Sequence, residues 1–316
     1  MLNYFLFSVN TVLPIFLVIA LGFALKRTGF LSEKFIATGN KLVFYILLPA
    51  AVFTSVSTTN LGELVSVGFA AFTVGSSVLS WAIIWAISAI FIKDKSILGA
   101  FVQGAFRSNM VFVGIPLMRN LAGEYGVARF ALIIALNMPI YNICSILVLS
   151  ACADTGEKLK LKTIAIAIAK NPLIIAITIG VAFALMGVRL PQPLTHTLGD
   201  LSGMATTLAL ICIGGGITFL GFDVKFKYAL IAAVVKVVVL PLAFTAAAFA
   251  LGFRNVELAA FMVVGGLPTA LAAYVMAVQI GCDAHISANI ILLSTLLSAI
   301  TLTLFVYVMM VLGLKV

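Results

Sequence analysis

The sequence predicts an all-α membrane protein of ten transmembrane helices, arranged as two inverted five-helix repeats. Hydrophobic residues make up 63% of the 316 residues and charged residues only 9%, with a mean hydropathy of +1.25. A soluble domain carries about 25% charged residues, so this chain could not cover a surface that faces water. Apolar runs of helix-spanning length and internal similarity between the two halves complete the prediction.

Ten apolar segments approach the roughly 20 residues that a helix needs to span the hydrocarbon core. The first ten residues lack the positive charges of a signal peptide, so we expect the helix that begins at Ser8 to be retained. A polar patch, ADTGEKLKLK, separates the fifth segment from the sixth. We expect helices near 8–26, 36–56, 65–92, 97–118, 128–152, 164–187, 197–221, 227–252, 256–280 and 286–312. The first repeat is then 1–152, the cytoplasmic linker 153–163 and the second repeat 164–316, in one intertwined bundle.

The basic residues predict the orientation. Twelve lie in the odd-numbered connections, against five in the even-numbered connections and the C-terminus. Short cytoplasmic loops are enriched in Lys and Arg, so both termini should be non-cytoplasmic in a multi-pass protein of the cell membrane. The net charge of +9 is explained in this way, and nucleic acid is not an expected partner.

The two halves resemble each other at a spacing of 158 residues. The segment from Pro14 in the first helix matches the segment from Pro172 in the sixth without a gap. The matched pairs are Pro14/Pro172, Gly22/Gly180, Ala24/Ala182 and Gly29/Gly187. An odd number of helices in each half makes the two repeats antiparallel.

The fourth and ninth segments each contain a helix-breaking phrase, FVGIPLM and VGGLPTA. Gly114 and Pro116 stand in the first, and Gly266, Pro268 and Thr269 in the second. Lipid cannot satisfy the backbone groups that a break frees, so a break must face protein, water or a ligand. In transporters with inverted repeats, such breaks meet near the midplane and present half-helix ends to the substrate, and helix N-termini suit an anion. The alternative is that both prolines make simple packing kinks.

Polar residues gather before the first proline. Gln103 and Arg107 are four residues apart and share a helix face. Arg107 lies about twelve residues, or ~18 Å, into the helix, and two interpretations stay open. It is a counter-charge for an anion, or its guanidinium extends to the membrane surface. Asn109 offers both donors and acceptors, to a substrate or to the broken backbone.

Other polar or small residues within the spans are further candidates. We expect Lys236 to pair with carbonyls freed by Pro241, or with Asp200. Asn137 lines a cavity or forms helix–helix hydrogen bonds. The remaining candidates are Gly214, where close packing is expected, and Tyr45 and Pro49, which make the second helix a candidate cavity wall.

The sequence predicts neither a cofactor nor a metal site. Cys144, Cys152, Cys212 and Cys282 form no CxxC motif and are expected to be small buried hydrophobes. His196 and His285 fall near predicted loops. All ten Asp and Glu residues lie at or near predicted loops, which disfavours both an intramembrane enzyme and an exchanger with buried acids.

At these residues the chain resembles the auxin efflux carrier family, within the bile acid/arsenite/riboflavin transporter group, as a bacterial-type member. The resemblance covers the chain from about Pro14 to Gly313. It is carried, in order, by NMVFVGIPLM from Asn109, EYG, KNPLIIAITIG from Lys170, VVKVVVLPL and GGLPTA. One departure is Thr207, where many relatives have proline.

The resemblance implies ten helices, with the fourth and ninth crossing at Pro116 and Pro268. It also implies a scaffold part, a moving part and often a homodimer. Plant members export an indole acetate, and bacterial members are associated with malonate, malate and similar carboxylates. By position, Asn109 would be a substrate-site residue.

The predicted function is secondary transport of a small organic carboxylate by alternating access, with that carboxylate and membrane lipid as partners. The alternative is an anion channel or a membrane-embedded sensor on the same bundle. The predicted substrate-binding residues are Asn109, Arg107, Gln103, Gly114, Pro116, Gly266, Pro268, Thr269, Asn137 and Tyr45. The predicted structural or coupling residues are Lys236, Pro49 and Gly214.

Overall fold

The structure is a computed structural model that describes residues 2–58, 66–153, 170, 172–188, 190–217 and 225–312. In these ranges all regular secondary structure is helical, apart from one isolated antiparallel β-bridge between Ser108 and Thr269. The all-α prediction is confirmed. Seven helices of this part of the chain are long and apolar enough to cross a membrane, and two shorter apolar helices accompany them. The expected linker lies outside the described residues except for Ala153, as does the start of the expected sixth helix.

Five of the expected segments correspond to single helices. These are α1 (Leu2–Arg27), α4 (Val67–Phe91), α8 (Pro172–Met186), α9 (Gln192–Gly216) and α14 (Ala284–Val311). The expected second and eighth segments are each divided by a π-helical turn. They form α2 (Glu33–Leu42) with α3 (Leu48–Ser57), and α10 (Phe226–Val234) with α11 (Leu240–Ala250). The expected fourth and ninth segments are interrupted. They contain α5 (Lys95–Phe106), the start of α6 (Ile115–Cys152), α12 (Asn255–Gly266) and α13 (Ala272–Ile280).

The long helix α6 carries both the end of the expected fourth segment and the whole of the fifth. A straight helix of its 38 residues would measure about 57 Å, nearly twice the thickness of the hydrocarbon core. It turns at Ala122 and Gly123, which leave helical geometry. Gly123 has a φ of 59°, which glycine adopts without the steric cost that a side chain would bring.

Each of the three π-helical turns in the described ranges ends two residues before a proline. The turns Val43–Leu47, Met110–Gly114 and Val235–Val239 precede Pro49, Pro116 and Pro241. Proline has no N–H, and its ring clashes with the carbonyl four residues earlier in a regular helix. The residue before each proline instead donates to the carbonyl five residues before itself, as a π-helix does. The wider turn therefore accommodates the proline without ending the helix.

The prediction that the fourth helix breaks at Pro116 is wrong for this reason. Pro116 lies in the first turn of α6, and the chain leaves helical geometry seven to nine residues earlier, at 107–109. The second break is where it was expected, because Pro268 lies in the non-helical stretch between α12 and α13.

Side-chain caps fix several helix starts. Ser32, Ser66, Asp94 and Asp283 each accept a hydrogen bond from the backbone amide three residues later. Such caps satisfy amides that have no partner within the helix. Burial alone would raise the pKa of Asp283, but hydrogen bonds from Lys225 and from a backbone amide outweigh it and lower that pKa below its usual value.

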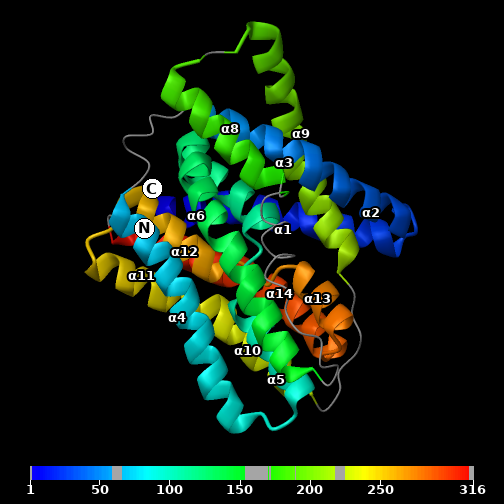
Figure 1. Cartoon of the computed structure of the whole chain (residues 1–316). Helices are drawn as coiled ribbons and strands as arrows, with labels where there is room; N and C mark the ends of the chain where they lie inside the picture. Colours follow the sequence, from blue (N-terminus) through cyan, green and yellow to red (C-terminus); the bar gives the residue numbers. More distant parts are fainter. Residues whose placement is uncertain are drawn as a thin grey trace.

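In Figure 1, α3, α8 and α9 form the upper part of the molecule, α4, α5 and α10 lie at the bottom, and α6 runs between them. Helix α1 packs against α9, and α3 packs against α8. A Cβ at Gly22 would collide with the carbonyl of Ile211, and one at Gly214 with the carbonyl of Ile19. Gly214 therefore serves the close packing expected of it. Helix α9 continues unbroken through Thr207.

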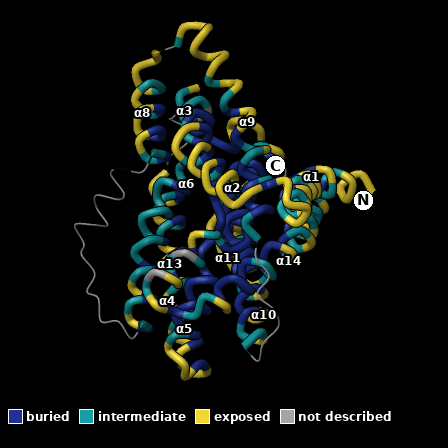
Figure 2. Tube along the Cα trace, turned by 90° about the vertical axis from the view of Figure 1, so that its right-hand side faces the viewer, coloured by how far each residue is buried: buried dark blue, intermediate teal, exposed yellow. Residues whose placement is uncertain are grey.

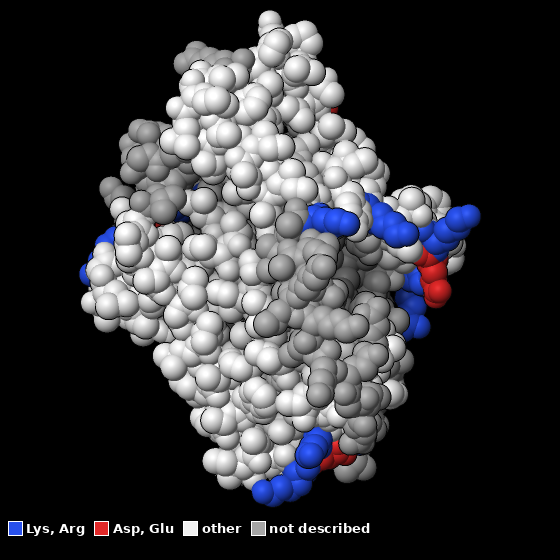
Figure 3. All heavy atoms as spheres, viewed as in Figure 1, with Lys and Arg blue, Asp and Glu red and all other residues white. Residues whose placement is uncertain are grey.

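The interior of the bundle is apolar, and so is much of its outer surface. Figure 2 shows buried segments through the middle of the molecule and exposed segments along α8, the upper part of α9 and the N-terminal end of α1. On the face seen in Figure 3, charged side chains lie in a band that extends inward from the right and at the lower end and left edge, and most of the other described surface is uncharged. This distribution fits a protein that is surrounded by lipid.

Candidate functional site

The candidate site is the place where the two non-helical stretches meet. The amide of Asn109 donates to the carbonyl of Pro268 (2.8 Å), and the amide of Ala270 donates to the carbonyl of Arg107 (3.3 Å). The two stretches therefore run antiparallel and satisfy each other's freed backbone groups. The expected meeting of the two breaks is present, with residues 107–109 rather than Pro116 as the first partner.

Two hydroxyl groups extend this pairing into the helices on either side. Ser108 Oγ donates to the carbonyl of Val264 (2.6 Å), and Thr269 Oγ1 donates to the carbonyl of Gly104 (2.7 Å). Gly104 and Val264 hold the same place, two residues before the last residue of α5 and of α12. Each break thus supplies a donor to the C-terminal turn of the opposite broken helix, where carbonyls have no partner within that helix.

Lys236 contributes a cation at the end of α12. Its side chain is 0% exposed, and its ammonium donates to the carbonyls of Gly265 (2.5 Å) and Val264 (3.5 Å). The expectation of a carbonyl partner is correct, but the carbonyls are those next to the second break and not those freed by Pro241. The C-terminal end of a helix carries partial negative charge, so a positive charge there is favourable.

Arg107 is buried, with 6% of its surface exposed, so its guanidinium does not extend to the membrane surface. The guanidinium donates to three groups of α6: the carbonyl of Tyr141 (3.2 Å), Ser145 Oγ (2.9 Å) and Asn142 Oδ1 (2.9 Å). Within the described part of the chain, no carboxylate lies within ion-pair distance of Arg107 or Lys236. Both positive charges are therefore held by neutral groups.

Asn109 begins the helical structure after the first break. It is 5% exposed, and its Oδ1 accepts a long hydrogen bond from the amide of Phe112 (3.4 Å). Its Nδ2 has no hydrogen-bond partner among the described residues. The side chain therefore caps the following π-helical turn and keeps two donor hydrogens available.

Gln103 is a second side-chain amide near the breaks, and it has an unused hydrogen-bond acceptor. It is fully buried, its Nε2 lies 3.6 Å from Met276 Sδ, and its Oε1 has no partner in the part of the chain that the structure describes. Because α13 carries Met276, this amide faces the helix that follows the second break.

Four other predicted residues have structural roles within the bundle. A Cβ at Gly114 would collide with the ring of Phe130, and one at Gly266 would come within 2.8 Å of Leu302. Asn137 Oδ1 accepts from Ser77 Oγ (3.0 Å), which is the helix–helix hydrogen bond that was one of its two interpretations. Pro49 follows a π-helical turn.

Tyr45 is not brought to the breaks. Its side chain is 61% exposed on the π-helical turn between α2 and α3, and its ring packs edge-to-face with Phe44. No residue of α2, α3 or the turn between them lines the two pockets described below, and this side chain points outward because it is on the opposite face from the buried Val43 and Leu47.

A small pocket of about 210 Å³ adjoins the second break. Leu271 and Tyr274, from the start of α13, line one side, and Gly216 and Ile217, at the end of α9, line another. Residues of α14 complete it: Ala288, Ile291 and Leu292. The pocket thus lies at the N-terminal end of α13, and helix N-termini favour negative charge.

The sequence reasoning missed Tyr141 and Ser145, although a signal was present. Asn137, Tyr141 and Ser145 are spaced by four residues, so they form one polar stripe along α6. Tyr141 accepts from Arg107 through its carbonyl, and its hydroxyl lies 3.3 Å from Ser108 Oγ. The stripe therefore holds the first break in place.

Arg119 and Asn120, also missed, tie α6 to two other helices. Arg119 donates to Ser202 Oγ (3.1 Å) and Thr206 Oγ1 (3.4 Å) on α9, and Asn120 Nδ2 donates to the carbonyl of Thr11 (3.0 Å) on α1. Both lie just before the turn in α6.

Comparison with known proteins identifies the family of the chain. The chain is 26% identical over 304 residues to an "Uncharacterized transporter" of Methanothermobacter thermautotrophicus, covering 95% of this chain and 98% of that protein. It is 28% identical over 299 residues to a "Putative malonate transporter" of Rhizobium meliloti, covering 92% of each. A family model described as "Membrane transport protein" matches residues 7–306. The chain therefore belongs to this family, the auxin efflux carrier family, and is a multi-pass membrane transporter.

Proposed function

We propose that this transporter carries a small organic carboxylate by alternating access around the two paired breaks. The observation that carries the proposal is the reciprocal bonding of the breaks, in which each supplies backbone and hydroxyl donors to the other. Broken helices paired in this way, with a pocket at a half-helix N-terminus, suit an anionic substrate. The relative named as a malonate transporter supports a dicarboxylate such as malonate.

We further propose that the chain consists of two inverted repeats of five helices. On this view α5 with the start of α6 is the fourth helix, the rest of α6 the fifth, and α12 with α13 the ninth. Matched positions at the ends of α1 and α8, which lie 158 residues apart in the chain, support the repeat. Gly29 and Gly187 both have positive φ just after α1 and α8, at 80° and 66°.

The packing of the first helix of each half supports the same repeat. Gly22 of α1 faces α9, and Gly180 of α8 faces Val56 and Phe53 of α3. The first helix of each half thus packs against the second helix of the other half. In the resulting mechanism, α1, α2, α3, α8 and α9 act as the scaffold, and the remaining helices with the paired breaks move relative to them.

In this mechanism the carboxylate meets the amides at the start of α13 and the unused donor hydrogens of Asn109. We propose that Arg107 and Lys236 add positive potential from behind the site, because both side chains are buried and directed at protein acceptors. An anion moved outward across an inside-negative membrane gains ~2.3 kcal/mol per charge per 100 mV, so potential can drive export. The excess of basic residues places the odd-numbered connections in the cytoplasm and both termini outside. A homodimer remains a prediction of the family resemblance.

The proposal is tested by binding. Purified protein should gain thermal stability with malonate or a related short acid, because a ligand that binds only the folded state stabilises it. Asn109→Ala should lose that gain while it keeps its own unfolding temperature within a few degrees. Asn10→Ala, at an exposed asparagine of α1, is the matched control and should respond as the wild type does. An undiminished gain in Asn109→Ala would remove Asn109 from the site.

A further inference from the structure

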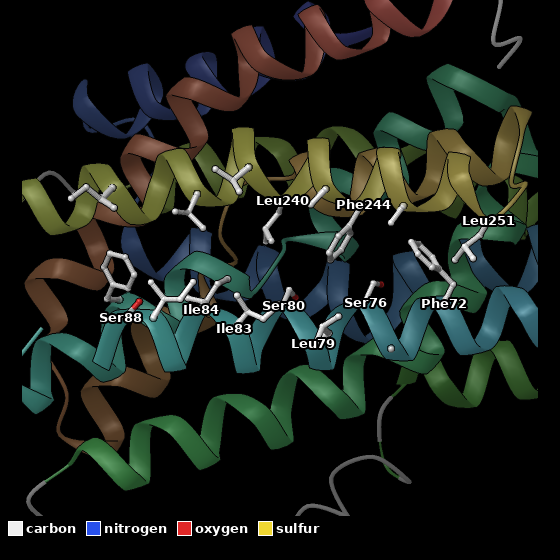
Figure 4. Close-up of a pocket in the computed structure, with 18 of the residues that line it drawn as sticks. Phe72, Ser76, Leu79, Ser80, Ile83, Ile84, Ser88, Leu240, Phe244 and Leu251 are labelled. Carbon is white, nitrogen blue, oxygen red and sulfur yellow. The ribbon is translucent and has the colours of Figure 1, made fainter. Parts of the chain in front are cut away.

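A long apolar groove lies on the outside of the bundle, between α4 on one side and α10 with α11 on the other. Its volume is about 1010 Å³. Figure 4 shows Phe72, Ile83 and Ile84 of α4 and Leu240 and Phe244 of α11 lining the space between the two helices. None of the residues of the paired breaks lines it.

The groove does not require a polar ligand. Ser76 Oγ donates to the carbonyl of Thr73 (3.3 Å), and Ser80 Oγ donates to the carbonyl of Ser77 (3.0 Å). These hydroxyls, which line the groove, are thus already bonded within their own helix. An unpartnered carboxylate would lose its hydration there, whereas hydrocarbon would lose nothing. The chemistry of the lining therefore selects an apolar chain.

The groove has the length of a membrane. Its lining on α4 begins at Gly68 and continues to Phe91 and Ile92, past the end of that helix. At 1.5 Å per residue this is about 35 Å, comparable to the roughly 30 Å of the hydrocarbon core. The groove is open to the outside of the bundle, so acyl chains can enter it from the bilayer.

One end of the groove is basic. Lys93 follows the lining residue Ile92, and Lys227 precedes the lining residue Tyr228, with its Nζ 5.1 Å from the centre of that ring. Both lysines are exposed, and neither forms an ion pair with a described residue. Anionic lipid attracts lysines at a membrane surface.

The described charges at this end are in positive excess. Asp94 and Asp283 stand there against Lys93, Lys95, Lys225 and Lys227, and Asp283 is paired with Lys225 (2.8 Å). Free positive charge is therefore available at the Lys93 end.

We propose that the Lys93 end of this groove binds an anionic phospholipid, with its acyl chains along α4 and α10 and its phosphate at Lys93 and Lys227. The site is separate from the carboxylate site and does not depend on the transported substrate. A second copy of the chain is the rival occupant.

The first test fills the groove. Ile87 lines it about 9 Å along α4 from Lys93 and is 53% exposed, so Ile87→Trp adds a larger ring to the open space without disturbing the core. Ile90→Trp is the matched control, because Ile90 on α4 is 63% exposed but does not line the groove. Native mass spectrometry of protein extracted from vesicles of phosphatidylglycerol and phosphatidylcholine should show retained phosphatidylglycerol in the control and its loss in Ile87→Trp.

The second test reverses the charge. Lys93→Glu with Lys227→Glu should weaken phosphatidylglycerol binding by at least about thirtyfold, the equivalent of roughly 1 kcal/mol per lysine, and should leave phosphatidylcholine binding unchanged. Lys34→Glu with Lys41→Glu, at exposed positions of α2, makes the same change in net charge away from the groove. It should behave as the wild type does, and this arm stands even if Ile87→Trp does not fold.

Equal phosphatidylglycerol retention in the wild type, the filled groove and the charge-reversed groove would overturn the proposal. So would conversion of a dimer to a monomer by Ile87→Trp with no change in bound lipid, because the groove would then be a contact between two copies. The unfolding temperature of all four variants reports folding, and failure of malonate binding in the wild type would count against the proposed function alone.

Discussion

Arg107 shows how one buried charge can shape a site without touching its ligand. The Arg107 guanidinium donates hydrogen bonds to three groups of α6, and the Arg107 carbonyl accepts one from the amide of Ala270. The residue therefore links α6 to both breaks. A planar guanidinium can bond several acceptors at once, which an ammonium cannot do in the same geometry.

We expect Arg107→Lys to keep the positive charge and still impair the protein. The shorter ammonium cannot span Tyr141, Ser145 and Asn142, so buried acceptors lose their donors, at a cost of about 1–3 kcal/mol each. The unfolding temperature and the affinity for malonate should both fall, and Lys34→Arg should change neither. Wild-type affinity in Arg107→Lys would instead mean that charge alone matters at this position.

The elements of the bundle are shaped by proline in two different ways. Pro268 lies in a true interruption between two helices, whereas Pro49, Pro116 and Pro241 each follow a π-helical turn inside a continuous helical run. The wider turn at Met110–Gly114 begins directly after Asn109 and so sets the direction of that side chain.

Pro116→Ala should therefore raise stability and lower transport. Alanine restores an N–H and removes the ring that requires the wider turn, so the π-helical turn can tighten to a regular α-helix with one more backbone hydrogen bond. The tightening rotates Asn109 away from the second break. Unfolding temperature and malonate uptake measure the two effects.

Pro49→Ala is the matched control for that experiment. It relaxes the equivalent turn between α2 and α3, remote from the breaks, and should gain stability while it keeps transport. Equal transport by both variants would show that the π-helical turn has no part in the mechanism.

At the scale of the whole molecule, the proposed movement requires α6 to separate from α9. The side chain of Arg119 holds the two helices together through Ser202 and Thr206. Arg119→Ala should lengthen and broaden the distances between spin labels placed at Tyr125 on α6 and Gly199 on α9. Arg254→Ala should not, because its guanidinium donates to the carbonyls of Phe249 and Phe253 and lies over the Phe249 ring, away from both labels. An unchanged distribution in Arg119→Ala would argue against this contact as a gate.

Much of the architecture was predictable because lipid imposes simple rules on a chain. The apolar composition alone predicted membrane-spanning helices. A helix break in lipid requires a partner for its freed backbone groups, and the second break provides that partner. The position of the first break was not predictable from Pro116, because a π-helical turn can absorb a proline that local rules assign to a break.

Side-chain partners were predictable only where spacing along one helix defines them. The stripe of Asn137, Tyr141 and Ser145 follows from their four-residue spacing, but its contact with Arg107 depends on how two helices pack. The same is true of Lys236, whose carbonyl partners lie 28 and 29 residues away in the chain. Tyr45 was assigned to the site because it is polar, yet the face on which it lies is decided by packing.

Counterflow of labelled malonate in proteoliposomes tests the central claim most directly. Wild-type protein should show saturable uptake that unlabelled malonate on the opposite side accelerates, because one site alternates between the two faces. Asn109→Ala should abolish that acceleration, and Asn10→Ala should preserve it. Flux that rises without saturation and ignores malonate on the opposite side would contradict the account and indicate a channel.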